Sequence, residues 1–134
     1  MKVVLDSNVL LVSIPSKSKY HCIYQAFLDN KFELIISNEI INEYTEIINR
    51  KANEFVAKNI IETIIFSKNV SFQNIYFNFN LIEIDPDDNK FVDCAIAGSA
   101  DFIVTNDKHF NILKSIQFPK VYSISIDDFL RILS

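Results

Sequence analysis

Four acidic residues stand where a folded chain would bring carboxylates together. Asp6 ends the first apolar run of the chain, and Asp107 follows another apolar run near the carboxyl terminus. Glu43 lies within a stretch of helical periodicity, and Asp88 opens a second such stretch. A carboxylate beside hydrophobic segments is costly to bury without a partner, so these acids are expected to hold something.

A hard divalent cation is the partner that such residues predict. Oxygen ligands without histidine or cysteine suit Mg²⁺ or Mn²⁺. Ions of this kind can activate water and stabilise the charge of an in-line phosphoryl displacement. The chain has no GxSxG turn that would present a serine nucleophile. The predicted chemistry is therefore phosphodiester hydrolysis by metal-activated water.

The position of each acid supports this interpretation to a different degree. A single aspartate at a strand end is most often a helix cap or a turn former, but two at one sheet edge favour a shared site. Glu43 lies about 100° from the centre of its helix's apolar face, on the flank of the buried stripe. Glu39 and Glu46 lie about 140–160° away and are expected in solvent.

The segment DPDDNK, which begins at Asp85, places three acids within four positions. Asp88 or Asn89 is expected to begin a helix, where a carboxylate can cap the backbone and interact with the helix dipole. Three neighbouring acids repel one another unless a cation shares them. The segment is not an EF-hand, because Lys90 takes the position of its glycine and Ile96 that of its bidentate glutamate.

The composition narrows the function classes. The 134 residues, 49% hydrophobic and 22% charged, suit one globular domain with one core. Gly98 is the only glycine, which excludes a P-loop and a dinucleotide fingerprint. The net charge of −4 argues against a broad electrostatic grip on nucleic acid. It does not exclude a nucleic-acid enzyme, because bound divalent metal reverses the local sign of an acidic cluster.

Location and redox chemistry follow from what the sequence lacks. Cys22 and Cys94 form no CxxC motif and are expected to be small buried hydrophobes rather than a disulfide or zinc ligands. No apolar stretch approaches the ~20 residues of a membrane helix, and no signal peptide is recognisable. We expect a cytoplasmic protein.

Predicted strands alternate with predicted helices along the chain. The strands are expected at residues 2–5, 32–36, 81–84, 101–105 and 121–123. The helices are expected at residues 20–29, from Ser37 to 48 or beyond, 53–66, 88–99, 109–115, and after Ser125. Ser37 and Ser125 are expected to be the N-caps of their helices. Residues 70–80 fit a helix, a loop or a strand. This alternation predicts an α/β fold, a three-layer α/β/α sandwich with a mainly parallel sheet, forming one domain over residues 1–134. Ligands of such sheets bind outside the carboxyl ends of the strands, where Asp6 and Asp107 would lie.

Four segments in order resemble the PIN domain family, in particular its toxin branch in type II toxin–antitoxin systems, the VapC-type ribonucleases. They are VVLDSNVLL, SNEIINEYTEII, DPDDNKFVDCAIAGSADFIVTNDKHF and PKVYSISIDDFL. The third is the most specific, since it combines an acid that opens a helix, a GSAD turn and an IVT-x-D strand end. The family often has a small residue where this chain has Asn106.

The resemblance implies a role for individual residues. It implies catalytic and metal-binding roles for Asp6, Glu43, Asp88 and Asp107. Asn8 and Thr105 match polar positions beside the site that would orient ligands or water. Asp93 also matches an acidic position, but we rank it below the other four because it projects about 140° away from Asp88 on a straight helix.

The resemblance further implies a Mg²⁺- or Mn²⁺-dependent ribonuclease with an RNA substrate, a cognate antitoxin over the acidic cleft, and a homodimer for which residues 72–79 are a candidate surface. Five cations could contact RNA at the cleft mouth, but ordinary surface charge is the preferred interpretation of each. They are Lys17, Lys19, His21, Lys108 and His109.

Two alternatives to the ribonuclease function stay open. One is a Mg²⁺-dependent phosphatase or phospho-acceptor with Asp6 as nucleophile, although Ser7 and Asn8 break both known patterns. The other is a catalytically inactive PIN-like binding module.

Overall fold

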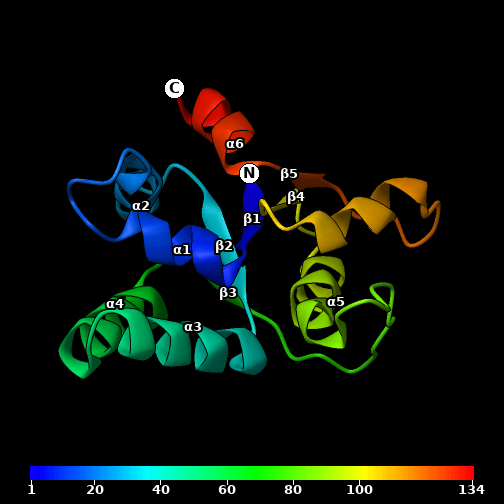
Figure 1. Cartoon of the computed structure of the whole chain (residues 1–134), viewed down its shortest axis with the longest axis horizontal. Helices are drawn as coiled ribbons and strands as arrows, with labels where there is room; N and C mark the ends of the chain where they lie inside the picture. Colours follow the sequence, from blue (N-terminus) through cyan, green and yellow to red (C-terminus); the bar gives the residue numbers. More distant parts are fainter.

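A five-stranded, all-parallel sheet flanked by helices forms the centre of the protein (Figure 1). The structure is a computed structural model that describes residues 1–134. The strand order is β3-β2-β1-β4-β5. The strands are β1 (Lys2–Leu5), β2 (Glu33–Ile36), β3 (Val70–Phe72), β4 (Phe102–Val104) and β5 (Ser123–Ile124). The predicted α/β fold with a parallel sheet is confirmed.

Six α-helices and two 3₁₀ helices, η1 and η2, connect and cover the strands. They are α1 (Ser7–Ser13), α2 (His21–Leu28), α3 (Asn38–Lys51), α4 (Glu54–Phe66), η1 (Pro86–Asp88), α5 (Asn89–Ala97), η2 (Lys108–Ser115) and α6 (Ile126–Leu133). Ser37 and Ser125 accept hydrogen bonds from the first turns of α3 and α6, so both predicted N-caps are confirmed. None of the helices combines the length and the apolar character needed to cross a membrane.

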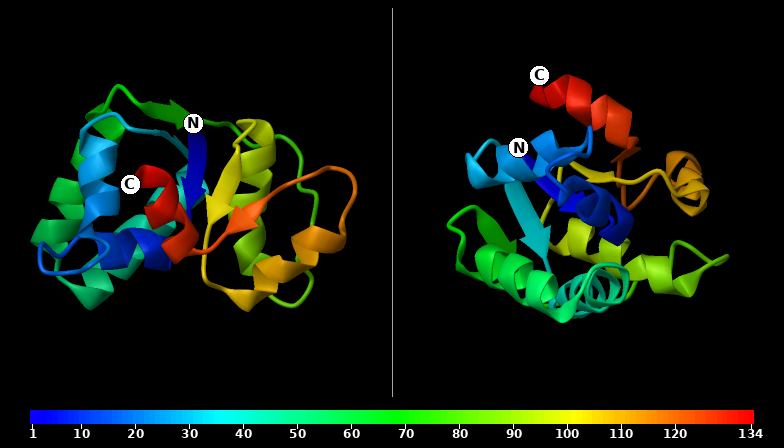
Figure 2. Two further views of the ribbon diagram at one scale, coloured as in Figure 1. Left: turned by 90° about the horizontal axis from the view of Figure 1, so that it is seen from above. Right: turned by 60° about the vertical axis from the view of Figure 1, so that its left-hand side comes forward.

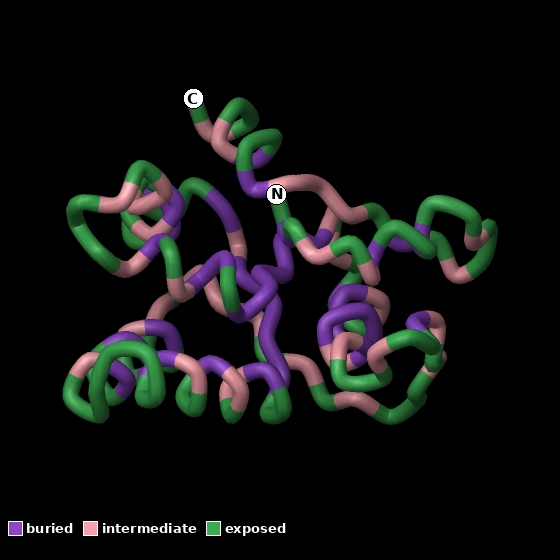
Figure 3. Tube along the Cα trace, in the orientation of Figure 1, coloured by how far each residue is buried: buried purple, intermediate pink, exposed green.

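The core lies along the central strands, which are the most deeply buried part of the trace (Figure 3). Val3, Val4, Ile35, Ile36 and Ile103 are fully buried. Helix α5 packs against β1, β2 and β4. Strands of a parallel sheet are covered on both faces and so consist of nearly continuous apolar residues, which is why these short runs predicted strands correctly.

One predicted strand, residues 81–84, is wrong. This segment is irregular because the side chain of Asn89 replaces a neighbouring strand. The Asn89 Oδ1 accepts a 2.9 Å hydrogen bond from the Ile82 N–H, and its Nδ2 donates a 2.8 Å bond to the Ile82 carbonyl. The main-chain groups of Ile82 are therefore satisfied without a ladder. Residues 70–80, left open by the sequence, begin as β3 and continue without regular structure.

Helix α1 follows β1 directly and was not predicted. Its N-cap is Asp6, whose Oδ1 accepts a 3.3 Å hydrogen bond from the Asn8 N–H. The apolar residues Val9 and Leu10 are buried on this helix. The short apolar run after Asp6 therefore returns to the core as a helix.

The order of the strands creates a crevice beside β1. From β1 the chain continues to β2 and β3 on one side, and later returns to β4 and β5 on the other side. β1 and β4 lie next to each other and point the same way (Figure 2). Such a switch point, outside the carboxyl ends of the strands, is where open α/β sheets bind ligands.

Candidate metal centre

Asp6 and Thr105 follow adjacent strand ends. Leu5 is paired with Val104, and the Asp6 N–H extends the ladder by donating to the Val104 carbonyl at 3.1 Å. The Thr105 Oγ1 donates a 2.7 Å hydrogen bond to Asp6 Oδ2. Burial raises the pKa of Asp6, while the hydrogen bonds from Thr105 and Asn8 oppose that rise. The first acid is thus buried, oriented and held from two sides.

Asp107 is connected to Asp6 through the same threonine. Its backbone N–H donates to Thr105 Oγ1 at 3.0 Å. Its Oδ1 accepts a 2.9 Å bond from the His109 N–H and caps η2. Both strand-end acids are therefore helix N-caps, and both also line one cleft. Each strand-end aspartate is therefore both a helix cap and a member of a shared site, the two interpretations that the sequence offered.

Asp88 occupies the N-cap position of α5 but makes no capping hydrogen bond. Asp85 instead caps the preceding η1 by accepting from the Asp87 N–H at 3.2 Å. The Asp88 carboxylate is thereby free to face the cleft. Burial raises the pKa of Asp88 to about 6, and neighbouring carboxylates reinforce the shift.

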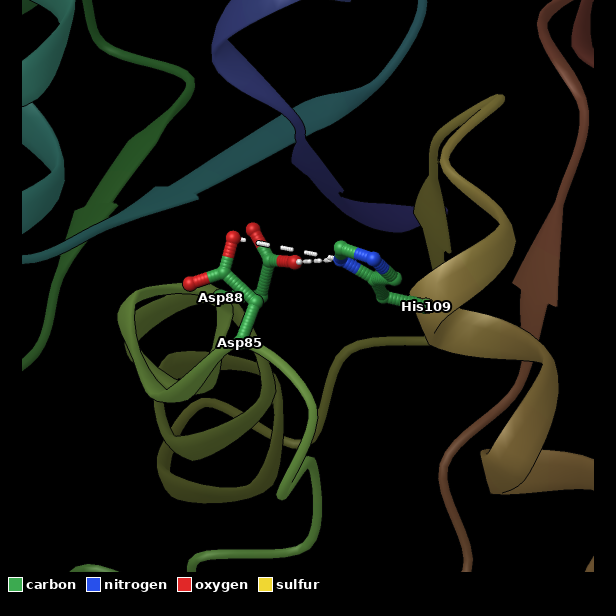
Figure 4. A group of neighbouring side chains, drawn as sticks. All are labelled: Asp85, Asp88 and His109. Carbon is green, nitrogen blue, oxygen red and sulfur yellow. Dashed lines mark hydrogen bonds and ion pairs between the residues drawn. The ribbon is translucent and has the colours of Figure 1, made fainter.

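His109 faces three acids at once. Its Nδ1 lies 3.1 Å from Asp88 Oδ2, 3.4 Å from Asp107 Oδ1 and 3.9 Å from Asp85 Oδ2. Figure 4 shows Asp85 and Asp88 pointing toward this ring from the segment that begins α5. The hydrogen bond to Asp88 raises the pKa of His109. Sequence reasoning favoured ordinary surface charge for His109. Its position two residues after Asp107 is the sequence signal that could have placed it at the site.

Glu43 reaches the cleft from α3. The neighbouring Tyr44 is fully buried, and its hydroxyl donates a 2.6 Å bond to the Leu5 carbonyl, which joins α3 to the end of β1. Glu43 Oε2 accepts a hydrogen bond from Ser7 Oγ, and Oε1 accepts one from Lys90 Nζ at 2.7 Å. Neither of these partners was identified from the sequence.

Asp93 lies apart from this group. Its carboxylate accepts a 3.0 Å hydrogen bond from the Phe79 N–H and is buried against the irregular segment after β3. It does not line the cleft that Asp6 and Asp88 share. Asn8 does line that cleft, and its side chain is exposed there.

The cleft has a volume of about 510 Å³ and a strongly negative lining. Its acidic residues are Asp6, Glu39, Glu43, Glu46, Asp85, Asp87, Asp88 and Asp107. Its basic residues are Arg50 and Lys90. One ligand atom each from Asp85, Asp88 and His109 lie within 4.8 Å of one another. This concentration of carboxylates fits a divalent cation, and an imidazole beside them adds a donor that Mn²⁺-type ions accept more readily than Mg²⁺.

The comparison with known families agrees with this geometry. The family description of the PIN domain matches residues 2–109. The chain belongs to the PIN domain family. The match extends from β1 to the first residues of η2, so it includes every element that contributes an acid to the cleft. No curated protein sequence matches this PIN domain significantly.

Two solved structures resemble this PIN domain in fold. The first is VapBC2 from Rickettsia felis bound to a DNA fragment from their promoter, with a TM-score of 0.63, 15% identity, and coverage of 93% of this chain and 98% of that chain. The second is VapC20 of Mycobacterium tuberculosis, a sarcin-ricin loop cleaving toxin, with a TM-score of 0.59, 13% identity, and coverage of 90% and 98%. At these identities the likeness shows the VapC-like fold.

Proposed function

We propose that this PIN domain, residues 1–134, is a metal-dependent endoribonuclease that hydrolyses phosphodiester bonds of single-stranded RNA. The observation that carries the proposal is the convergence of Asp6, Asp88 and Asp107, from β1, the start of α5 and the end of β4, on one cleft. The residue-by-residue resemblance to VapC-type ribonucleases supports the same acids.

The proposed roles follow from the contacts. Asp6, Asp88 and Asp107 would hold Mg²⁺ or Mn²⁺, with Glu43 beside them. When bound, such an ion supplies Lewis-acid polarisation of the scissile phosphate and a lowered pKa of water. Thr105 keeps the Asp6 carboxylate oriented toward the cleft. His109 balances the charge of Asp88 and Asp107 when the acids are not shared by a metal.

Cleavage of single-stranded RNA by the purified chain tests this proposal. We expect cleavage with Mn²⁺ or Mg²⁺ and none with EDTA. Asp6→Asn and Asp107→Asn should each abolish it, because each removes one of the few charges that hold the ion. Asp29→Asn, at an exposed acid after α2, is the matched control and should cleave normally. Strong cleavage by both cleft variants would refute the assignment.

The two alternatives predict different results. A phospho-acceptor would become phosphorylated on Asp6 by a small phosphodonor. An inactive binding module would leave RNA intact while remaining folded, and would not bind Mn²⁺ in calorimetry. Neither alternative is favoured by a contact in the structure.

We further propose that the chain is the toxin of a toxin–antitoxin pair. VapBC2, which resembles this PIN domain in fold, is a toxin–antitoxin complex. A partner that covers the acidic cleft would neutralise this domain. A short gene immediately upstream, encoding a DNA-binding start and a helical tail, should yield a protein that co-purifies with the chain and stops RNA cleavage. A protein that co-purifies without inhibiting cleavage would contradict the toxin role.

A homodimer is the second proposed assembly. In the segment after β3, Tyr76 is 91% exposed and Phe77 is 65% exposed, which is unusual for large apolar side chains. Light scattering should show a dimer, and the double substitution Tyr76→Ser and Phe77→Ser should convert it to a monomer. A wild-type monomer at micromolar concentration would refute this assembly.

A further inference from the structure

Lys90 is a cation inside the acidic cleft rather than at its surface. It is the second residue of α5, and its side chain is only 11% exposed. Its Nζ lies 2.7 Å from Glu43 Oε1 and 2.9 Å from Asp87 Oδ1. Lysine is rarely buried unless it is paired. Because Asp87 is 70% exposed, the buried pairing is with Glu43.

Glu43 is occupied on both oxygens. Oε1 accepts from Lys90, and Oε2 accepts from the Ser7 hydroxyl. The negative charge of this carboxylate is therefore already balanced by a cation that belongs to the chain. Asp6 differs from it, because its partners are neutral hydroxyl and main-chain donors. Asp88 and Asp107 share the His109 ring with Asp85, and that ring is 35% exposed and able to turn toward solvent, whereas the Lys90 side chain is enclosed.

The acids of the cleft thus divide into two groups. Asp85, Asp88 and Asp107 surround the ring of His109, which is about one third exposed. Glu43 and Asp87 share Lys90. A second divalent ion bound at Glu43 would have to approach the Lys90 ammonium closely. Two cations a few ångströms apart repel strongly in a partly desolvated site.

We propose that Lys90 takes the place of a second metal ion, so that the centre binds one divalent cation at Asp6, Asp88 and Asp107 while Glu43 serves as the partner of Lys90 and not as a metal ligand. This inference rests on the proposed metal-dependent function. Two-metal nucleases hold a pair of ions about 3.5–4 Å apart to clamp the attacking and leaving oxygens. Here the Lys90 ammonium occupies Glu43 instead, so this carboxylate is not free to bind a second ion on that side of the cleft. Lys90 is a positioning residue, because it acts through Glu43.

Mn²⁺ titration of the full chain, followed by calorimetry and electron paramagnetic resonance, tests the inference independently of activity. The wild type should bind one Mn²⁺. Lys90→Met removes the charge at similar length and should bind a second Mn²⁺, seen as spin coupling between neighbouring ions. Lys90→Arg keeps the charge and should bind one. Lys114→Met, at an exposed lysine of η2, is the matched control and should also bind one.

A second pair of variants settles the matter if Lys90→Met does not fold. Glu43→Gln combined with Lys90→Met removes both charges of the pair and should leave the affinity for Mn²⁺ close to that of the wild type, whereas Asp107→Asn should weaken it by about tenfold or more. A wild type that binds two ions, or an affinity lost equally in the double variant and in Asp107→Asn, would overturn the inference while leaving a metal-dependent nuclease intact. A wild type that binds no Mn²⁺ would overturn the proposed function as well.

Discussion

The hydroxyl of Thr105 donates a 2.7 Å hydrogen bond to the carboxylate of Asp6, a residue 99 positions earlier in the chain. The bond forms because β1 and β4 are parallel neighbours whose last residues, Leu5 and Val104, are paired. Burial opposes ionisation of Asp6, and this hydrogen bond favours it. Thr105 therefore helps to determine both the charge and the direction of the first acid of the cleft.

Thr105→Val keeps the shape of the side chain but removes its hydroxyl. Asp6 then loses a donor and the Asp107 N–H loses an acceptor, so the pKa of Asp6 should rise further. We expect the free energy of unfolding to fall by about 1–3 kcal/mol, measured by urea denaturation. The affinity for Mn²⁺ should fall by about tenfold or more, measured by calorimetry. Thr105→Ser, which keeps the hydroxyl, should restore most of both values. Unchanged Mn²⁺ affinity in the valine variant would contradict this role.

The stability of the metal-free protein should fall as the pH rises. The pKa of Asp88 is about 6 in the folded chain against 3.8 as its ordinary value, so the folded state holds this proton more tightly. Stability from Asp88 is therefore lost between about pH 4 and pH 6, by about 1–2 kcal/mol once partial solvent screening is allowed for. The raised pKa of His109 acts in the same direction at higher pH, because its ion pairs are lost as the ring deprotonates.

Melting curves recorded in EDTA from about pH 4 to pH 8 measure this effect. In Asp88→Asn, the fall in stability between about pH 4 and pH 6 should disappear. In His109→Gln, the further fall at higher pH should disappear. Mn²⁺ should raise the melting temperature most above pH 6, where Asp88 is ionised and able to bind it. Parallel curves for the wild type and Asp88→Asn between pH 4 and pH 6 would show that Asp88 does not titrate as described.

Asp93→Asn tests whether Asp93 binds metal as Asp6, Asp88 and Asp107 are proposed to do. The Asp93 carboxylate accepts from the Phe79 N–H, away from the cleft, and an asparagine oxygen can accept the same bond. We expect unchanged affinity for Mn²⁺ in calorimetry, in contrast to Asp88→Asn, which should lose affinity. A comparable loss in both variants would place Asp93 among the metal ligands.

Gly98→Ala tests a close contact behind the site. The backbone of Gly98 is ordinary, with φ at −93°, but an added Cβ would lie 2.5 Å from Ile35 Cγ2 in the buried strand β2. Overpacking of this kind costs about 1–3 kcal/mol, measurable by urea denaturation. Ala97→Ser, at the preceding exposed position, is the control and should change stability by less than about 0.5 kcal/mol. Equal stability of the glycine and alanine proteins would mean that the sheet yields there without cost.

Local patterns were sufficient for most of the elements. Buried parallel strands are short apolar runs, and the caps at Ser37 and Ser125 depend on residues three positions away, so both were readable from the sequence. The same logic failed at residues 81–84, because the hydrogen bonds of Ile82 go to the side chain of Asn89 instead of a strand. It also failed at α1, where a short apolar run resembles a strand as much as a helix.

By itself, the sequence determined the parallel α/β fold and the placement of Asp6 and Asp107 at strand ends, because those features depend on local periodicity and on the position of each acid relative to its apolar run. Only the tertiary structure decided which charges meet. His109 faces Asp88, Lys90 faces Glu43 across 47 positions, and Asp93 faces Phe79 instead of the cleft. These pairings depend on how separate elements pack around the β1–β4 crevice, and no spacing along one element encodes that arrangement.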